Sequence, residues 1–102
     1  MTFYNQKEFE NLRITFYFKV SFYEGNWRND EKNGKGVFYY SNGDRYEGEW
    51  EDGERNGVGA YYFAGGGVYE GGWRKEKKEG RGVMRLEGEV IEGEWLDGEF
   101  VK

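Results

Sequence analysis

The chain has neither cysteine nor histidine among its 102 residues. This absence excludes disulfide bridges, cysteine-type zinc sites, thiol nucleophiles and catalytic triads built on histidine. No stretch approaches the roughly 20 consecutive apolar residues of a membrane-spanning helix. Residues 1–12 contain acids and lack the apolar core of a signal peptide. We therefore expect a cytoplasmic protein.

Aliphatic side chains are scarce as well. Leu, Ile, Val and Phe account for only 20 of the 102 residues, close to the limit below which charged chains remain disordered. Proline is absent, and 18 glycines stand beside aromatic residues at fixed spacing, unlike a disordered linker. Aromatic residues make up 21% of the chain, and each buried ring removes roughly 150–250 Å² from water. A fold held by rings and backbone pairing is therefore expected.

The formal net charge of the chain is −5. Nucleic acids and anionic membranes are bound through clustered Lys and Arg side chains. The charge therefore disfavours both as partners of the whole chain.

The four tryptophans recur at intervals of 23, 23 and 22 residues and share a pattern of neighbours. They are Trp27, Trp50, Trp73 and Trp95. A glycine precedes each by two residues, and a tyrosine precedes the first three by four residues, with Ile91 at that position in the fourth unit. Gly-x-Gly pairs follow at 34/36, 57/59 and 80/82. The chain is therefore a tandem repeat.

Each repeat predicts a β-hairpin. Rings and carboxylates alternate along residues 46–50, so they lie on opposite faces of one strand. Glycines beside the rings leave room for them to lie across the strand and let the sheet bend. Turns are expected at 51–56 and 74–80, and Asn42-Gly43 predicts a hairpin link between repeats. The expected strands are 23–28, 36–40, 46–51, 59–63, 69–74, 82–86 and 91–95, in an all-β, single-layer antiparallel ribbon that is open at both ends.

The N-terminal residues follow a different pattern. Residues 14–23 alternate apolar and polar side chains, which predicts one amphipathic strand capping the first repeat. Residues 5–12 predict a short helix, with Asn5 as its N-cap and Glu8 three residues later. We expect a capping segment at 1–22 and a ribbon at 23–102, divided into units 23–45, 46–68, 69–90 and a half unit 91–102 without a second strand.

Tyr-x-Gly-x-Trp followed by Gly-x-Gly, with a period of about 23 residues, resembles the MORN repeat (membrane occupation and recognition nexus) over residues 23–99. The resemblance implies an elongated β ribbon that serves as a scaffold or interaction surface, as in ciliary, cytoskeletal and junctional proteins. The usual turn glycine is present as Gly53 and Gly98 but is replaced by Asp30 and Glu76. Because Glu tolerates a positive φ poorly, we expect the third turn to differ in geometry.

Two sequence features raise the question of catalysis. Glu47 and Glu49 lie on one strand face, ~6–7 Å apart, a separation that suits a glycosidase pair. Acids recur at the same place in the other units, so a solvated face that blunts aggregation is favoured. The Gly-x-Gly pairs lack the third glycine and the helix of a dinucleotide site. We expect no catalytic residues and no enzymatic activity.

Metal binding is also disfavoured by the sequence. Acids gather near two turns, but their spacing differs from that of an EF-hand. They are Asp30, Glu31, Asp52 and Glu54. We expect no metal ligands and no cofactor.

A row of aromatic residues is the main candidate site. The rings either form the core or line a groove that accepts a segment of a partner protein. The predicted groove consists of Tyr23, Trp27, Tyr46, Trp50, Tyr61, Tyr69, Trp73 and Trp95.

A second candidate site is basic, and it is either a solvated turn or a contact for phosphoinositides or acidic protein surfaces. It consists of Arg74, Lys75, Lys77, Lys78 and Arg81. Choline- or carbohydrate-binding hairpin repeats, in which rings cage a ligand cation, are a further alternative, although their Gly-Trp-Tyr order differs.

The sequence therefore predicts a non-enzymatic scaffold subunit that binds partner proteins through the aromatic groove and an open sheet edge. Homo- or hetero-association is expected at the strand 91–95. The resemblance favours an axonemal or other cytoskeletal assembly, and recruitment to a membrane surface is the alternative.

Overall fold

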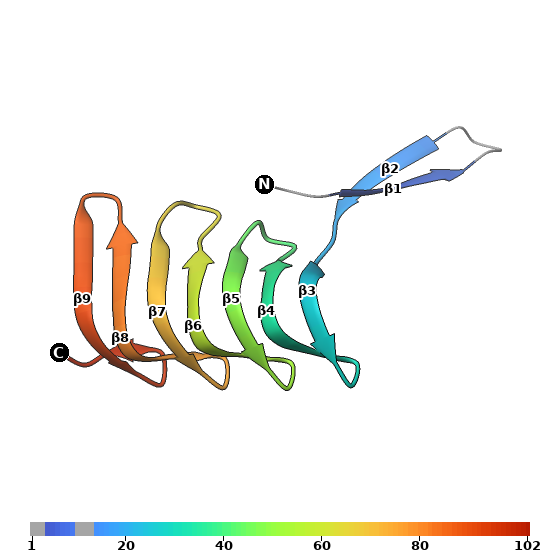
Figure 1. Ribbon diagram of the computed structural model, residues 1–102. Coiled ribbons are helices and arrows are strands. Elements are labelled where there is room, and N and C mark those ends of the chain that lie inside the picture. The colour runs from blue at the N-terminus through green and yellow to red at the C-terminus, as the bar shows by residue number, and fades with distance from the viewer. Residues whose placement is uncertain (1–3, 10–13) are drawn as a thin grey trace.

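The computed structural model describes the backbone of residues 4–9 and 14–102, and side chains from Val20 onward (Figure 1). Eight strands form one open antiparallel sheet in which each strand pairs with its neighbours in the sequence, so the expected all-β ribbon is confirmed. The strands are β3 (Phe22–Arg28), β4 (Glu31–Tyr39), β5 (Arg45–Glu51), β6 (Glu54–Tyr62), β7 (Val68–Arg74), β8 (Lys77–Leu86), β9 (Glu89–Leu96) and β10 (Glu99–Phe100). Within the described ranges, no helix has the length and apolar character needed to cross a membrane.

The strands bend along a row of glycines. The pairing register places Gly25, Gly36, Gly48, Gly59, Gly71, Gly82 and Gly93 side by side across the sheet. Just after this row the register shifts in the first three hairpins, as in a β-bulge, and the strands curve sharply there (Figure 1). A Cβ at Gly59 would collide with the phenol of Tyr46. Glycine is therefore needed because a ring lies across the backbone.

The turns inside the repeats are shorter than expected. The predicted turns at 51–56 and 74–80 are wrong, because β6 begins at Glu54 and β8 at Lys77. Each turn is two residues long, and both residues have positive φ, as in a type I′ hairpin. These pairs are 29–30, 52–53, 75–76 and 97–98.

The third turn shares this geometry, so the expected difference at Glu76 is also wrong. Glu76 has φ 76°, comparable with 82° at Gly53 and 88° at Gly98. Neighbouring groups hold it there, since the Glu76 amide donates to the Arg55 carbonyl at 3.0 Å and its Oε1 accepts from the Arg55 amide at 2.5 Å. These bonds offset the strain of a left-handed non-glycine residue.

The N-terminal residues pair as a separate two-stranded sheet of β1 (Tyr4–Phe9) and β2 (Ile14–Lys19). The expected helix over 5–12 is wrong for residues 5–9, and residues 10–12 lie outside the described residues. The expected single strand over 14–23 is interrupted after Lys19 and resumes as β3. A helix of eight residues is marginal without packing, whereas the edge of β2 offers a strand partner.

The fourth repeat has the beginning of a second strand, which was not predicted from the sequence. Glu99 pairs with Leu96 and Phe100 with Trp95. The amide of Glu94 donates to the carbonyl of Lys102, and the amide of Val101 donates to the carbonyl of Glu94. Part of the edge of β9 is therefore covered by the chain itself.

Candidate interaction surfaces

The aromatic face of the sheet, which carries Tyr46 and Trp50, forms the core of the protein. Tyr46 and Tyr69 are fully buried, and three tryptophans are 4–6% exposed. These are Trp50, Trp73 and Trp95. Five of the eight rings predicted to line a groove are thus inside the protein. Tyr23 and Tyr61 are half-buried, and Trp27 is 58% exposed.

The three buried tryptophans share one environment. The indole of Trp73 donates to the carbonyl of Gly59 at 3.0 Å and meets the ring of Tyr46 edge-on at 5.3 Å. Trp50 and Trp95 make the corresponding bonds to Gly36 and Gly82. Each therefore docks onto the second strand and the tyrosine of the preceding repeat. Among the described residues, nothing makes these contacts with Trp27, whose one ring contact there is with Tyr23 of its own strand.

A column of cations lies over the rings. Arg55 lies 4.8 Å from the ring centroid of Trp73, and Lys32 lies 5.2 Å from that of Trp50. Lys78 lies 5.7 Å from that of Trp95, and desolvation by burial lowers the pKa of Lys78, with a further contribution from Arg55. This column was not predicted from the sequence. Its signal was a cation at a 23-residue interval, five residues after each of the first three tryptophans.

Burial also raises the pKa values of tyrosines on the aromatic face. Burial raises the pKa of Tyr69 to about 12, and it raises the pKa of Tyr46 well above the ordinary value. The pKa of Tyr61 is raised by burial and by its hydrogen bond to Asp44, whose Oδ2 accepts from the phenol at 2.6 Å. Asp44 also accepts from the amide of Ala64 at 2.8 Å, so it ties two successive loops together.

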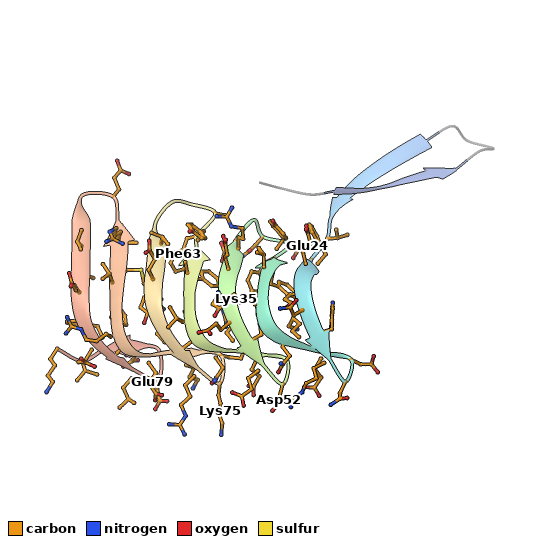
Figure 2. The ribbon with its side chains drawn as sticks, viewed as in Figure 1. Glu24, Lys35, Asp52, Phe63, Lys75 and Glu79 are labelled. Atoms are coloured by element: carbon orange, nitrogen blue, oxygen red, sulfur yellow. The ribbon has the colours of Figure 1, made fainter. Side chains whose placement is uncertain are left out.

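The predicted basic site is divided by the structure. Lys78 lies over core rings, and Arg81 forms ion pairs with Glu92 and Glu94 at 3.8 and 3.6 Å. Arg74, Lys75 and Lys77 remain exposed around the β7–β8 turn, although Arg74 lies 3.7 Å from Glu79. Figure 2 shows Lys75 and Asp52 at turns along one end of the sheet. The five residues therefore do not form one patch.

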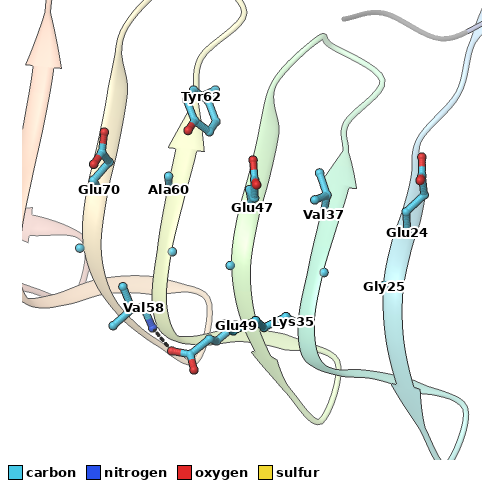
Figure 3. A pocket seen from close by; sticks show the side chains of 14 residues that line it. Glu24, Gly25, Lys35, Val37, Glu47, Glu49, Val58, Ala60, Tyr62 and Glu70 are labelled. Carbon is cyan, nitrogen blue, oxygen red and sulfur yellow. Dashed lines mark hydrogen bonds between the residues drawn. The ribbon is translucent and has the colours of Figure 1, made fainter.

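The back face, opposite the rings, carries Glu47 and Glu49. The register aligns a row in which glutamates on β3, β5 and β7 alternate with Val37 and Ala60 (Figure 3). This row and the backbone of the glycine row line a trough of about 750 Å³. Glu49 is held on the opposite side of the glycine row, where its Oε1 accepts from the amide of Val58 at 2.6 Å. Glu47 and Glu49 thus face different sides of the trough.

The acids near the turns do not assemble into a metal centre. In the described part of the chain, no three acidic side chains converge on one point where a metal ion could be held. Gly53, between Asp52 and Glu54, instead donates its amide to the carbonyl of Lys32, which links one repeat to the next.

The comparison with known families agrees with the repeat period of the sheet. The MORN repeat model matches residues 23–45, 46–68 and 69–87. No curated protein matches the chain. The three matched units coincide with the hairpins β3–β4, β5–β6 and β7–β8, and together they span more than half of the sequence. The chain therefore belongs to the MORN-repeat family.

Proposed function

We propose that the chain is a non-enzymatic protein-interaction module that accepts a β-strand of a partner protein along the free edge of β3. MORN repeats are generally non-enzymatic and serve as protein-interaction or membrane-associated modules. The single observation that carries the proposal is the environment of Trp27. It is the one tryptophan of the four without a carbonyl acceptor, a cation or a second ring in the described part of the chain.

The contacts between repeats define what the edge of β3 would accept. At each internal junction, the second strand of one repeat pairs with the first strand of the next. That second strand supplies a cation over the tryptophan and a glycine carbonyl for its indole. β3 ends the sheet, and no described strand pairs with its outer edge. Adding a strand there would satisfy unpaired backbone groups and bury Trp27, as in other β-augmentation complexes.

The opposite end of the sheet is a weaker candidate. Phe100 packs edge-on against Trp95 at 5.4 Å, and residues 101–102 bond to Glu94. The contacts of residues 100–102 cover part of the edge of β9. The association predicted at residues 91–95 could therefore use only the rest of that edge. We therefore assign the primary edge to β3.

The experiment uses a peptide with the sequence of residues 54–63, which supplies Arg55 and Gly59 as they occur at an internal junction. We expect saturable binding to the full chain, detected by the fluorescence anisotropy of the labelled peptide. Trp27→Ala should abolish binding without unfolding the protein, because Trp27 is largely exposed. Leu96→Ala, which removes another exposed apolar side chain, is the matched control and should bind normally.

A peptide with Arg55 replaced by alanine should bind more weakly, because Arg55 is the cation that lies over the tryptophan at an internal junction. Binding that persists in Trp27→Ala, or no binding by the unmodified chain, would reject the proposal.

We further propose that this module works in an axonemal or other cytoskeletal assembly in the cytoplasm. The support is the repeat family alone. An affinity purification with the intact chain and with Trp27→Ala as baits tests it. Cytoskeletal proteins retained only by the unmodified chain would support the assignment, and their absence would oppose it.

Recruitment to a membrane surface is the second candidate, and the exposed side chains of Arg74, Lys75 and Lys77 favour it. Three cations at about 1 kcal/mol each provide weak, salt-sensitive attraction to anionic lipid. We expect binding to phosphatidylserine vesicles only at low salt, with loss by about 0.3 M salt. Tight binding at that ionic strength would favour this function over the first.

A further inference from the structure

We propose that the back-face trough binds an extended basic peptide segment of a partner protein, with Lys or Arg at every third residue facing Glu24, Glu47 and Glu70. This surface lies on the face opposite the rings and is separate from the site proposed around Trp27.

The spacing of the carboxylates favours an extended peptide. The register places Glu24, Glu47 and Glu70 in one row, with one strand between each pair. Strands lie ~4.8 Å apart, so successive glutamates are ~10 Å apart along the row. A polyproline II segment advances ~3.1 Å per residue and presents every third side chain on one side, which gives ~9.3 Å. Three cations of such a segment therefore match three carboxylates.

The same spacing excludes a single metal ion as the occupant. A cation such as Ca²⁺ needs its oxygen ligands at about 2.3–2.6 Å, and carboxylates ~10 Å apart cannot share one. The negative row also opposes nucleic acid and anionic lipid. A chain of several separated positive charges remains as the complementary ligand.

The third repeat shows this surface in an occupied state. Arg85 lies 3.4 Å from Glu70, and Arg81 lies between Glu92 and Glu94. In the second repeat the corresponding positions are Val58 and Tyr62. The second strand of the third repeat thus places its guanidinium groups on these carboxylates, whereas the second strand of the second repeat has none at the corresponding positions.

The trough itself is suited to a peptide backbone. Val37 and Ala60 are small, and the glycine row between its two sides has no side chains, so a segment can approach the sheet closely. Glu24 has no ion-pair partner in the described part of the chain, and Glu47 has only Arg45 at 3.9 Å. Arg45 stacks over Tyr62 at 4.1 Å, which shows how an incoming guanidinium can be received at the rim.

The test is a titration of the full chain at low salt with a labelled peptide of about nine residues that carries arginine at every third position, with proline and alanine between. A peptide of equal composition with its arginines adjacent is the spacing control. We expect saturable binding of the first peptide and at least about fivefold weaker binding of the second.

The triple variant Glu24→Gln, Glu47→Gln, Glu70→Gln should weaken binding about tenfold, because it removes three exposed and individually weak ion pairs. The matched control, Glu54→Gln, Glu87→Gln, Glu99→Gln, makes the same charge change at exposed positions away from the trough and should bind nearly as the unmodified chain. Far-UV circular dichroism verifies that both variants fold.

Three results would overturn the proposal: no binding by the unmodified chain, equal weakening by both triple variants, or equal affinity for the two peptides. Trp27→Ala should bind the spaced peptide normally. This separates a failure of the trough from a failure of the β3 edge.

Discussion

At the scale of single residues, the aromatic rings occupy the space that side chains at the glycine positions would fill. Gly59 is buried, and the ring of Tyr46 lies where its side chain would be. Gly65 lies in a loop and has no left-handed φ, and a Cβ at that position would have no atom within 4 Å. The two glycines therefore have opposite tolerance for substitution.

We predict that Gly59→Ala lowers the free energy of unfolding by about 3 kcal/mol, because it overpacks the core. Gly65→Ala should change it by less than about 0.5 kcal/mol. Urea denaturation followed by tryptophan fluorescence measures both values. Equal effects of the two substitutions would contradict the role of the glycine row as space for the rings.

Arg55 joins two repeats through its backbone, its guanidinium and its position over the rings. We predict that Arg55→Ala lowers the free energy of unfolding by about 2 kcal/mol. It removes a cation–π contact with Trp73 and the hydrogen bond that Nη2 donates to the carbonyl of Glu76 at 2.9 Å. Arg74→Ala, at an exposed position at the end of β7, is the control and should have almost no effect in the same urea experiment.

The buried tyrosines make the stability of the protein depend on pH in the alkaline range. The pKa of Tyr69 is about 12 in the folded protein, against 10 as its ordinary value. Because folding favours the neutral phenol, this stabilisation is complete below pH 10 and is lost as pH rises through about 12.

We predict cooperative alkaline unfolding in that window. Phenolate absorbance and circular dichroism should show that the core tyrosines ionise together with the loss of structure. Ionisation of every tyrosine near pH 10 in a folded protein would contradict the burial of Tyr46 and Tyr69.

At the scale of elements, the hairpin turns allow a direct comparison among repeats. Asn29, Asp52 and Asp97 occupy the first turn position in three repeats, and Lys75 occupies it in the third. All four have a positive φ, which Asn and Asp tolerate better than Lys.

We predict that Lys75→Asn raises the free energy of unfolding by about 0.5–1 kcal/mol, by relieving strain in the left-handed region. Lys77→Asn, two residues later at the start of β8, has no such strain to relieve and should be neutral or destabilising. A thermal melt of each variant against the parent decides the point. Destabilisation by Lys75→Asn would show that the turn does not need a left-handed residue there.

The strands were predictable where side chains alternate and less so at their ends. The Tyr-x-Gly-x-Trp period located β3, β5, β7 and β9 within two residues. The second strands begin about five residues earlier than expected, because charged residues near 54 and 77 suggested long turns. Cross-strand pairing with the first strand keeps these residues in the sheet, and that pairing is tertiary information.

At the scale of the whole molecule, each strand of the large sheet contacts its neighbours in sequence, so stability is a sum over repeats and their junctions. The period in the sequence determined this architecture. The period did not determine which aromatic rings are exposed to solvent. Trp27 and Trp73 have the same local pattern, and only the presence of a preceding repeat separates an exposed ring from a buried one.

The trough on the back face was also hidden from the sequence. Glu24, Glu47 and Glu70 were recognisable as recurring acids. Their alignment in one row depends on the register across intervening strands, and that register is set by the rings on the other face. The cations over the rings were likewise visible in the sequence as a 23-residue period. Their position over the rings could not be inferred until the turns were located.

The central claim is that three tryptophans form the core and one remains open for a partner. The most direct test is hydrogen exchange at the four indole N–H groups, followed by two-dimensional nuclear magnetic resonance. We predict three slowly exchanging signals, from the indoles that donate to Gly36, Gly59 and Gly82, and one fast signal that disappears in Trp27→Phe. Four fast signals, or a slow signal assigned to Trp27, would contradict the claim.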